Sequence, residues 1–198
     1  MTREEQKKFR EQKEYLKVKS KEYAKQFALK KKDYMFYHSA KQMFYCMMFF
    51  MKETGICISF YAKPLWMDDI LWDILKMSSN KKEPVSLRSI GAYTIHSNIK
   101  EYEETFQEEA DIERIIQDYF GMFKEFAQTF DEAEFLKNYQ NINWQQEIIQ
   151  TIVLIHENKF AEALEYLADK EIRDFVIGSK NFTELAVAYI KTCISEVK

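Results

Sequence analysis

Three aspartates in the segment MDDILWD, namely Asp68, Asp69 and Asp73, have a spacing that could support chemistry. On a helix Asp69 and Asp73 share one face, where two carboxylates could bind a divalent cation or act as general acid and base. Acidic residues are also typical of the solvated first turn of a helix, where they interact favourably with the helix dipole. We favour this second interpretation and expect no catalytic residue here.

Residues 43–51 (MFYCMMFFM) form an uninterrupted apolar run in which Cys46 lies among four methionines. Thioethers and a thiolate suit Cu(I), but in a strand these side chains would alternate between two faces, and methionine commonly fills irregular cores. We therefore interpret the run as core. Cys57 follows on the next predicted strand, where a hairpin would leave the two sulfurs ~13 Å apart, so we expect neither a disulfide nor a shared zinc ion.

The remaining motifs of common enzymes are missing from the sequence. His38, His96 and His156 are each isolated, with no cysteine or histidine at metal-ligand spacing. No phosphate-binding glycine loop, nucleophile elbow or zinc-protease motif is present, and the chain has only 4 glycines. We expect no metal, no cofactor and no standard nucleotide chemistry.

Charge is distributed unevenly along the chain. Residues 1–32 carry twelve Lys/Arg and five Glu, a balance of +7, so the remaining 17 basic and 27 acidic residues give −10 and the total is −3. A basic N-terminal segment can mark a nucleic-acid arm. The interspersed glutamates favour instead a solvated helix, which could also pack against the acidic stretch at residues 101–113.

Composition indicates a helical, packed protein. The chain has 198 residues, of which 46% are hydrophobic and 16% aromatic, and it has only 2 prolines, so helices should outnumber tight turns. Three cysteines and a charged start suggest a reducing compartment, which we take to be the cytoplasm. Residues 43–51 are far shorter than the ~20 apolar residues that span a bilayer, and we expect no membrane segment.

Hydrophobic spacing predicts the order of the elements. Residues 2–29 predict a helix with a narrow apolar stripe at Phe9, Leu16, Tyr23 and Phe27. Three short apolar runs at 34–37, 43–51 and 56–62 predict antiparallel strands. The middle run suits a central strand that is covered on both faces, or on one face with an oligomer contact on the other. A short helix follows Pro64, and residues 91–96 predict a fourth strand at the edge of the sheet.

The later half of the chain has helical periodicity. Apolar residues recur at helical spacing from Ile112 to Phe130, which predicts a long amphipathic helix starting near Glu108. Three shorter helices are predicted around Trp144 to Ile155, Phe160 to Leu167, and Asn181 to Val197, the last opened by a capping box.

The segment FALKKKDYMFYH at residues 27–38 resembles the start of an uncharacterised family of bacterial α+β domains of unknown function. That family has a helix, a Gly-Phe-Lys-Lys-Lys-like step, an aromatic strand, further strands and C-terminal helices; here Ala28-Leu29 stands in place of Gly-Phe. The resemblance extends by order of elements over residues 15–130. It implies a fold and no known activity.

Together these patterns predict an α+β protein, with an antiparallel sheet of about four strands, a long N-terminal helix and later helices. We expect an α+β domain at 1–135 and a helical subdomain at 136–198 packed on it.

Two functions remain open, and nucleic-acid binding is a less favoured third. The first is a non-catalytic protein-interaction module of immunity or adaptor type, binding another protein or a second copy of the chain through charged surfaces; its candidate residues are Lys7, Lys8, Lys17, Lys21, Lys25, Glu103, Glu104 and Glu108. The second is a small-ligand binder or enzyme with an aromatic pocket between sheet and helices; its candidate residues are Tyr37, Tyr61, Trp66, Trp72, Asp68, Asp69 and His96.

Overall fold

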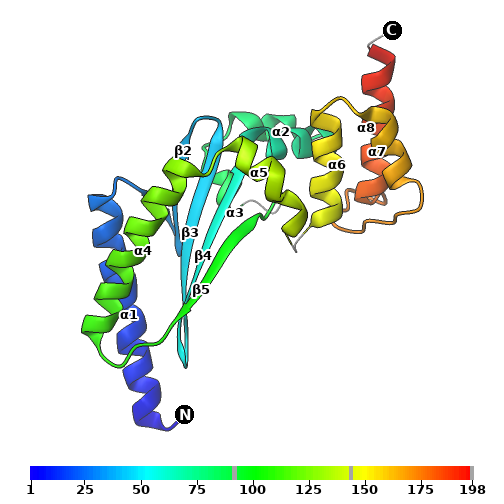
Figure 1. Ribbon diagram of the computed structural model, residues 1–198. Coiled ribbons are helices and arrows are strands. Elements are labelled where there is room, and N and C mark those ends of the chain that lie inside the picture. The colour runs from blue at the N-terminus through cyan, green and yellow to red at the C-terminus, as the bar shows by residue number, and fades with distance from the viewer. Residues whose placement is uncertain (91–92, 143–144, 197–198) are drawn as a thin grey trace. The chain divides into compact units, whose positions relative to one another are not determined.

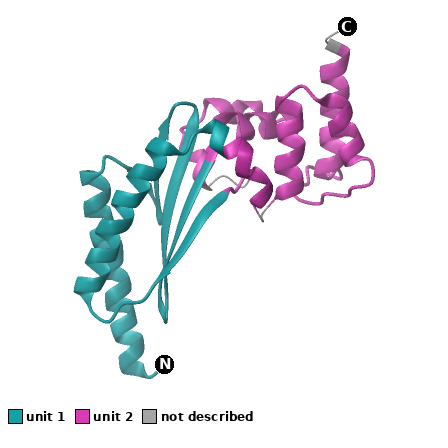
Figure 2. Cartoon of the chain, in the orientation of Figure 1, with its two compact units in different colours: residues 1–62, 98–134 teal, residues 63–97, 135–198 magenta. Residues whose placement is uncertain are grey.

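The computed structural model describes residues 1–90, 93–142 and 145–196, and the chain divides into two compact units (Figure 2). Unit 1 consists of residues 1–62 and 98–134, and unit 2 consists of residues 63–97 and 135–198. Each unit is therefore built from two separate segments of the chain.

Unit 1 is an α+β structure with the predicted long N-terminal helix, antiparallel sheet and long later helix, and with a short first strand that was not predicted. The first helix, α1, is followed by four strands, and the fifth strand precedes the long helix α4 (Figure 1). The bounds are α1 Arg3–Gln26, β1 Lys30–Lys32, β2 Met35–Ala40, β3 Met43–Lys52, β4 Gly55–Pro64, β5 Asn98–Glu104 and α4 Glu109–Thr129.

The strands form one antiparallel sheet in the order β1-β2-β3-β4-β5. β3 therefore lies in the middle of the sheet, which confirms the interpretation of the apolar run as a central strand. Cys46 and Cys57, on β3 and β4, are buried free thiols. Each strand pairs with its neighbour in the sequence, although the connection between β4 and β5 includes residues 65–97.

Helices α1 and α4 pack together and cover one face of the sheet (Figure 1). The core beneath them is aromatic: Phe60 on β4 lies 5.2 Å from Phe123 and 5.5 Å from Phe126, both on α4, between ring centroids. The predicted stripe of α4 is buried, from Ile112 to Phe126. Because the apolar residues of α4 recur at i, i+3 and i+4, they lie on one face of the helix, and this face is buried.

Helix α1 buries a stripe different from the one its aromatic residues suggest. The buried side chains recur every fourth residue: Gln12, Leu16, Ser20 and Ala24. Phe9 and Tyr23 are only half-buried beside them. Leu16 is the one large apolar side chain of this stripe.

Unit 2 is helical and includes the short helix α2 that follows β4. The predicted capping box at Asn181 is present, since the Asn181 and Glu184 side chains each accept the other's backbone N–H. Helix α5 crosses the boundary between the units and was not predicted. The bounds are α2 Leu65–Ile74, a 3₁₀ turn Ser78–Lys82, α3 Leu87–Ile90, α5 Glu132–Asn138, a second 3₁₀ turn Tyr139–Asn141, α6 Gln146–His156, α7 Phe160–Leu167 and α8 Phe182–Glu196.

The predicted fourth strand was wrong where the structure describes it. Residues 93–96 form a turn and irregular chain, and residues 91–92 lie outside the described residues. The edge strand is instead β5, in the glutamate-rich segment NIKEYEE, for which the sequence predicts no strand. Charged side chains are compatible with an edge strand because they discourage pairing with other chains.

None of the helices in the described parts of the chain combines the length and the apolar character needed to cross a bilayer.

Gly55, the first residue of β4, is required by close packing of the backbone. A Cβ atom at this position would clash with the carbonyl oxygen of Glu104 on β5, whereas a Cβ at Gly121, in an exposed turn of α4, would meet nothing within 4 Å. We expect Gly55→Ala to destabilise unit 1 by about 1–3 kcal/mol. We expect Gly121→Ala to stabilise it by about 0.5–1 kcal/mol, because alanine favours a helix.

Denaturant unfolding followed by tyrosine fluorescence and circular dichroism would measure both changes. Equal stability of the two variants would contradict the close approach of β4 and β5 at this position.

Candidate functional site

The buried aspartate Asp68 is part of a charged cluster within unit 2. Its Oδ1 atom accepts hydrogen bonds from Lys63 Nζ at 2.9 Å and from the backbone N–H of Ile95 at 2.9 Å. Lys63 Nζ also donates to the carbonyl oxygens of Arg88 at 3.0 Å and Ile95 at 2.6 Å. The ammonium of Lys63 thus uses its three hydrogens on three acceptors.

A second cation, Arg88, completes this cluster. Its Nη2 atom donates to Asp69 Oδ1 at 2.7 Å, and its Nη1 atom donates to the Leu65 carbonyl at 2.7 Å and lies 3.5 Å from Asp68 Oδ2. The guanidinium also lies over the ring of Trp72, 4.7 Å from its centroid. The structure therefore brings Asp68, Asp69 and Trp72 together around a residue that the sequence analysis had not singled out.

The cluster has the chemistry of a structural ion-pair network. Two cations and two carboxylates balance one another, and both cations and Asp68 are buried. Asp73, the third aspartate, lies apart from it and binds Ser78 at 2.8 Å and Lys81 at 2.5 Å. Among residues 1–90, 93–142 and 145–196, no three histidine, cysteine or acidic side chains are grouped as metal ligands.

The other residues predicted to line a pocket lie in different surroundings. In unit 1, Tyr37 is buried and stacks on Phe44 with 5.9 Å between ring centroids, and Tyr61 is half-buried on β4. In unit 2, Trp66 stacks on His156 at 3.7 Å. The exposed residue His96 donates its backbone N–H to Gln145 at 2.9 Å.

The predicted acidic surface is partly used inside unit 1. Glu103 binds Lys52 at 3.2 Å, and Glu104 accepts a hydrogen bond from the Tyr119 hydroxyl at 2.8 Å. Glu108 caps the N-terminus of α4. These contacts leave fewer carboxylates available for a partner than the sequence suggests.

The acidic residue that contacts the basic helix is Glu113 on α4. It accepts hydrogen bonds from the hydroxyl groups of Tyr15 at 2.8 Å and Tyr23 at 3.5 Å, and it lies 3.4 Å from Lys19 Nζ. The hydrogen bond from Tyr15, followed by the charge of Lys19, lowers the pKa of Glu113 below its usual range despite some desolvation. The expectation that α1 packs against acidic residues is met at this one carboxylate.

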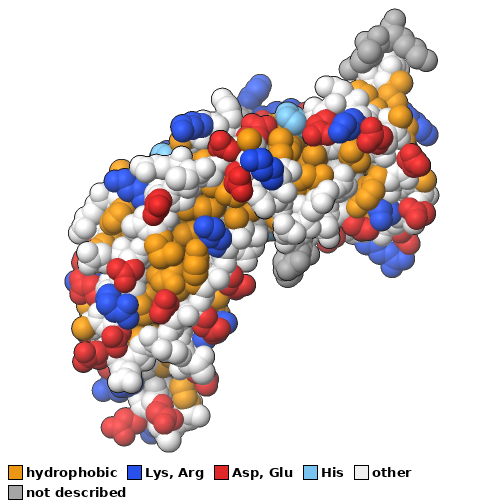
Figure 3. All heavy atoms as spheres, in the orientation of Figure 1, with side chains coloured by type: hydrophobic (Ala, Val, Ile, Leu, Met, Phe, Trp, Pro, Cys, Tyr) orange, Lys and Arg blue, Asp and Glu red, His pale blue; other side chains and the backbone are white. Residues whose placement is uncertain are grey.

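The predicted basic residues of α1 lie at the protein surface. Lys7 pairs with Glu11 at 3.9 Å and Lys17 with Glu14 at 3.1 Å. The remaining three candidates, Lys8, Lys21 and Lys25, are exposed. On the face shown in Figure 3, acidic and basic side chains are mixed over unit 1.

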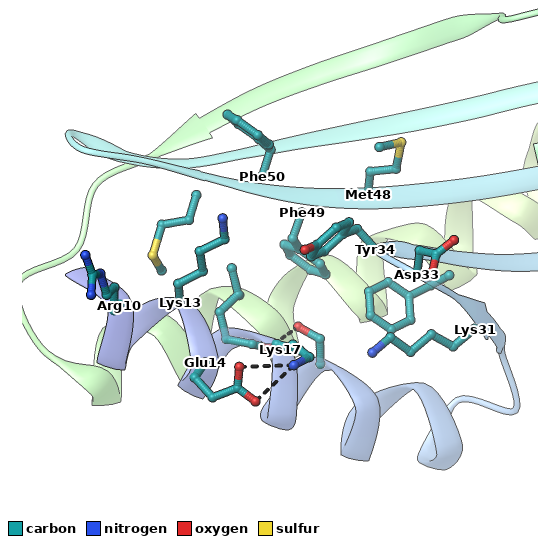
Figure 4. Close-up of a pocket in the computed structure, with 14 residues that line it drawn as sticks. Arg10, Lys13, Glu14, Lys17, Lys31, Asp33, Tyr34, Met48, Phe49 and Phe50 are labelled. Atoms are coloured by element: carbon teal, nitrogen blue, oxygen red, sulfur yellow. Dashed lines mark hydrogen bonds and ion pairs between the residues drawn. The ribbon is translucent and has the colours of Figure 1, made fainter. Parts of the chain in front are cut away.

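A groove in unit 1 lies between α1 and the end of strand β3 (Figure 4). It has a volume of about 300 Å³. Four buried side chains contribute to its apolar lining: Leu16, Phe36, Phe49 and Met51.

Two large apolar side chains stand exposed at the rim of this groove. Phe50 is 62% exposed and Tyr34 is 58% exposed. Phe49 and Phe50 extend to opposite sides of β3, so Phe49 faces α1 and Phe50 faces away (Figure 4). Exposed aromatic residues next to a hollow are more informative than single exposed apolar residues elsewhere.

Basic residues dominate the polar part of the groove. Arg10, Lys13 and Lys17 come from α1 and Lys31 from β1, against the two acidic residues Glu14 and Asp33. Lys17 is paired with Glu14. The groove therefore has an excess of positive charge.

Burial and the excess of positive charge both affect the pKa of Lys31. Its Nζ atom lies 5.8 Å from the centroid of the Phe36 ring. Burial, followed by the positive charges of Lys21 and Lys17, lowers its pKa below the usual range. A bound anion would relieve this repulsion.

Of the residues that line this groove, only Lys17 was predicted from the sequence as a candidate functional residue. The lysine run at 30–32 was an available signal, but an unbroken apolar run gives no indication that Phe50 is exposed. Comparison with protein-family models, curated proteins and solved structures finds no match for this chain.

Removing one partner of the buried cluster should destabilise unit 2. We expect Asp68→Asn to cost about 3–5 kcal/mol, because it leaves Lys63 buried without its counter-charge. Asp73→Asn is the matched control on the same helix, and we expect it to cost only about 0–1 kcal/mol because its ion pair is partly exposed.

Tryptophan fluorescence during urea unfolding measures this change, because all three tryptophans, Trp66, Trp72 and Trp144, belong to unit 2. If Asp68→Asn lowered the free energy of unfolding by no more than Asp73→Asn does, the cluster would not be structurally important.

Glu113→Gln should loosen α1 in a pH-dependent way. A carboxylate whose folded pKa is lowered stabilises the folded state above its unfolded pKa, and this contribution is lost as pH falls through the folded pKa. We therefore expect faster amide exchange in α1 of the variant at neutral pH, with the difference from the wild type vanishing in acid. Glu125→Gln, at an exposed position of α4, is the control. A difference that persisted unchanged at low pH would contradict the role of the Glu113 charge.

Proposed function

We propose that the protein is a non-catalytic interaction module, of adaptor or immunity type, that binds an acidic and apolar segment of a partner protein in the groove between α1 and β3. The observation that carries the proposal is the combination of exposed aromatic side chains and unbalanced basic residues at one groove. Neither feature is needed for the fold, because Phe50, Tyr34, Arg10 and Lys13 are exposed and lie outside the buried core of unit 1.

The apolar part of the groove supports a protein partner. Phe50 and Tyr34 expose large apolar surfaces beside the buried Phe49 and Met51. Exposed aromatic residues next to a hollow are typical of the central contacts of protein interfaces.

The charged part of the groove supports an acidic partner. In the described part of the chain, Arg10 and Lys13 form no ion pair with another side chain, so both are available to a partner's carboxylates. Such contacts would chiefly increase the rate of association and its dependence on salt.

The composition of the groove argues against the other classes of function. Its described lining residues include no histidine or cysteine, so it lacks the commonest general base and a thiol nucleophile. The whole chain has a net charge of −3. This net charge disfavours a long nucleic-acid backbone more than a short acidic segment.

Reversal of the unpaired groove charges should reduce partner capture. We expect Arg10→Glu combined with Lys13→Glu to weaken retention of an acidic partner from host lysate by about tenfold or more at low salt, since two attractive contacts become repulsive. Quantitative mass spectrometry of proteins captured by the wild type and by the variant measures this effect, after nuclease treatment of both samples.

Lys8→Glu combined with Lys25→Glu is the matched control, because it makes the same change of charge on α1 outside the groove. A partner lost equally from both variants would indicate non-specific charge effects. Capture that depends on intact nucleic acid, or that is unaffected by the groove variant, would contradict the proposal.

A further inference from the structure

We infer that the partner segment binds in the groove as an added β-strand, paired with the free edge of β3. This inference rests on the proposed function and specifies the conformation of the bound segment.

The edge of β3 is open beside the groove. The ladder between β2 and β3 ends at the pair Met35↔Met48, whereas β3 continues to Lys52. On that side, residues 49–52 have no paired strand in the described part of the chain. Their backbone groups on that side offer a template for one more strand.

The turn between β1 and β2 explains why β2 stops there. Lys32 pairs with Met35, so only Asp33 and Tyr34 connect the two strands. Asp33 has a positive φ of 52°, the left-handed conformation that tight hairpins require. Because the chain reverses at this point, β2 cannot extend along the remainder of β3.

The groove lies along the edge of the strand rather than over one of its faces. Its lining includes the consecutive residues Met48, Phe49, Phe50 and Met51. Consecutive side chains of a strand point to opposite faces, so a hollow lined by all four must run along the edge. Figure 4 shows this arrangement, with Phe49 on the α1 side of β3 and Met48 and Phe50 on the other.

The two sides of the edge differ in chemistry, which specifies the pattern of the added strand. On the α1 side stand the cations Arg10, Lys13 and Lys17, of which Lys17 is paired with Glu14; on the other side stand Met48 and Phe50. A strand at this edge would present alternate side chains to the two sides. The fitting segment therefore alternates acidic and apolar residues.

Two synthetic peptides of the same composition test this conformation. The strand-patterned peptide is Glu-Val-Glu-Phe-Glu-Val-Glu, and the helix-patterned peptide is Glu-Val-Glu-Glu-Phe-Val-Glu, with apolar residues at i, i+3 and i+4. Calorimetry or fluorescence anisotropy with the full-length protein gives their dissociation constants. We expect the strand-patterned peptide to bind about tenfold more tightly, because only it places all its acids on one side of a strand.

Backbone methylation provides a test that is independent of side-chain pattern. Two further versions of the strand-patterned peptide carry N-methyl groups at either its odd or its even residues. In an added strand only alternate amides face β3. We expect one version to lose about tenfold or more in affinity, from two or three missing hydrogen bonds of about 1 kcal/mol each, and the other to bind nearly as well as the parent.

Hydrogen exchange on the protein provides the matching observation. Amides of residues 49–52 that face the groove should become protected by the strand-patterned peptide. Arg10→Glu combined with Lys13→Glu should abolish that protection, whereas Lys8→Glu combined with Lys25→Glu should leave it unchanged.

These outcomes distinguish a failure of strand addition from a failure of the proposed function. Equal or tighter binding of the helix-patterned peptide, or equal losses from both methylated versions, would overturn strand addition and leave an acidic partner in the groove. Failure of both peptides to bind would overturn strand addition and the acidic-segment proposal together.

Discussion

The ring of Phe120 on α4 holds the layers of unit 1 together. It lies 6.3 Å from Tyr23 and 5.6 Å from Phe27 at the end of α1, and 5.2 Å from Phe36 on β2 and 5.8 Å from Phe49 on β3, between ring centroids. Aromatic pairs at these distances contribute beyond the area that they bury. This one side chain therefore fixes the C-terminal end of α1 on the sheet.

The position of Phe120 and its aromatic neighbours also explains why a groove forms. α1 has few large apolar residues in its N-terminal half, and its contacts with Glu113 of α4 come from Tyr15, Lys19 and Tyr23 in its C-terminal half. The N-terminal half contributes Arg10 and Lys13 rather than a hydrophobic seal beside the end of β3. The free edge of β3 therefore remains accessible.

Unit 2 relies on a different kind of interaction. Its short helix α2 is joined to residues 88–95 by the ion pairs and hydrogen bonds of Lys63, Asp68 and Arg88, all buried. Buried ion pairs are costly to form and very costly to break, so they specify one arrangement of the chain more than they add to its stability. The aspartates that look catalytic in the sequence are engaged by cations, of which Lys63 lies close to Asp68 along the chain and Arg88 lies distant from Asp68 and Asp69.

The sequence by itself determined the elements whose pattern is strong and local. The period of Ile112 to Phe126 allowed only an amphipathic helix, and the nine-residue apolar run indicated a central strand. The sequence did not reveal the strand at Asn98–Glu104 because its glutamates are also common at helix starts, and only pairing with β4 decides between the two. The tertiary structure alone decided the exposure of Phe50, which depends on where β2 ends, and the contacts of Asp68 with Arg88 and Ile95, which are distant from it in sequence. Local periodicity encodes which face of an element is apolar, whereas the site depends on what neighbouring segments leave uncovered.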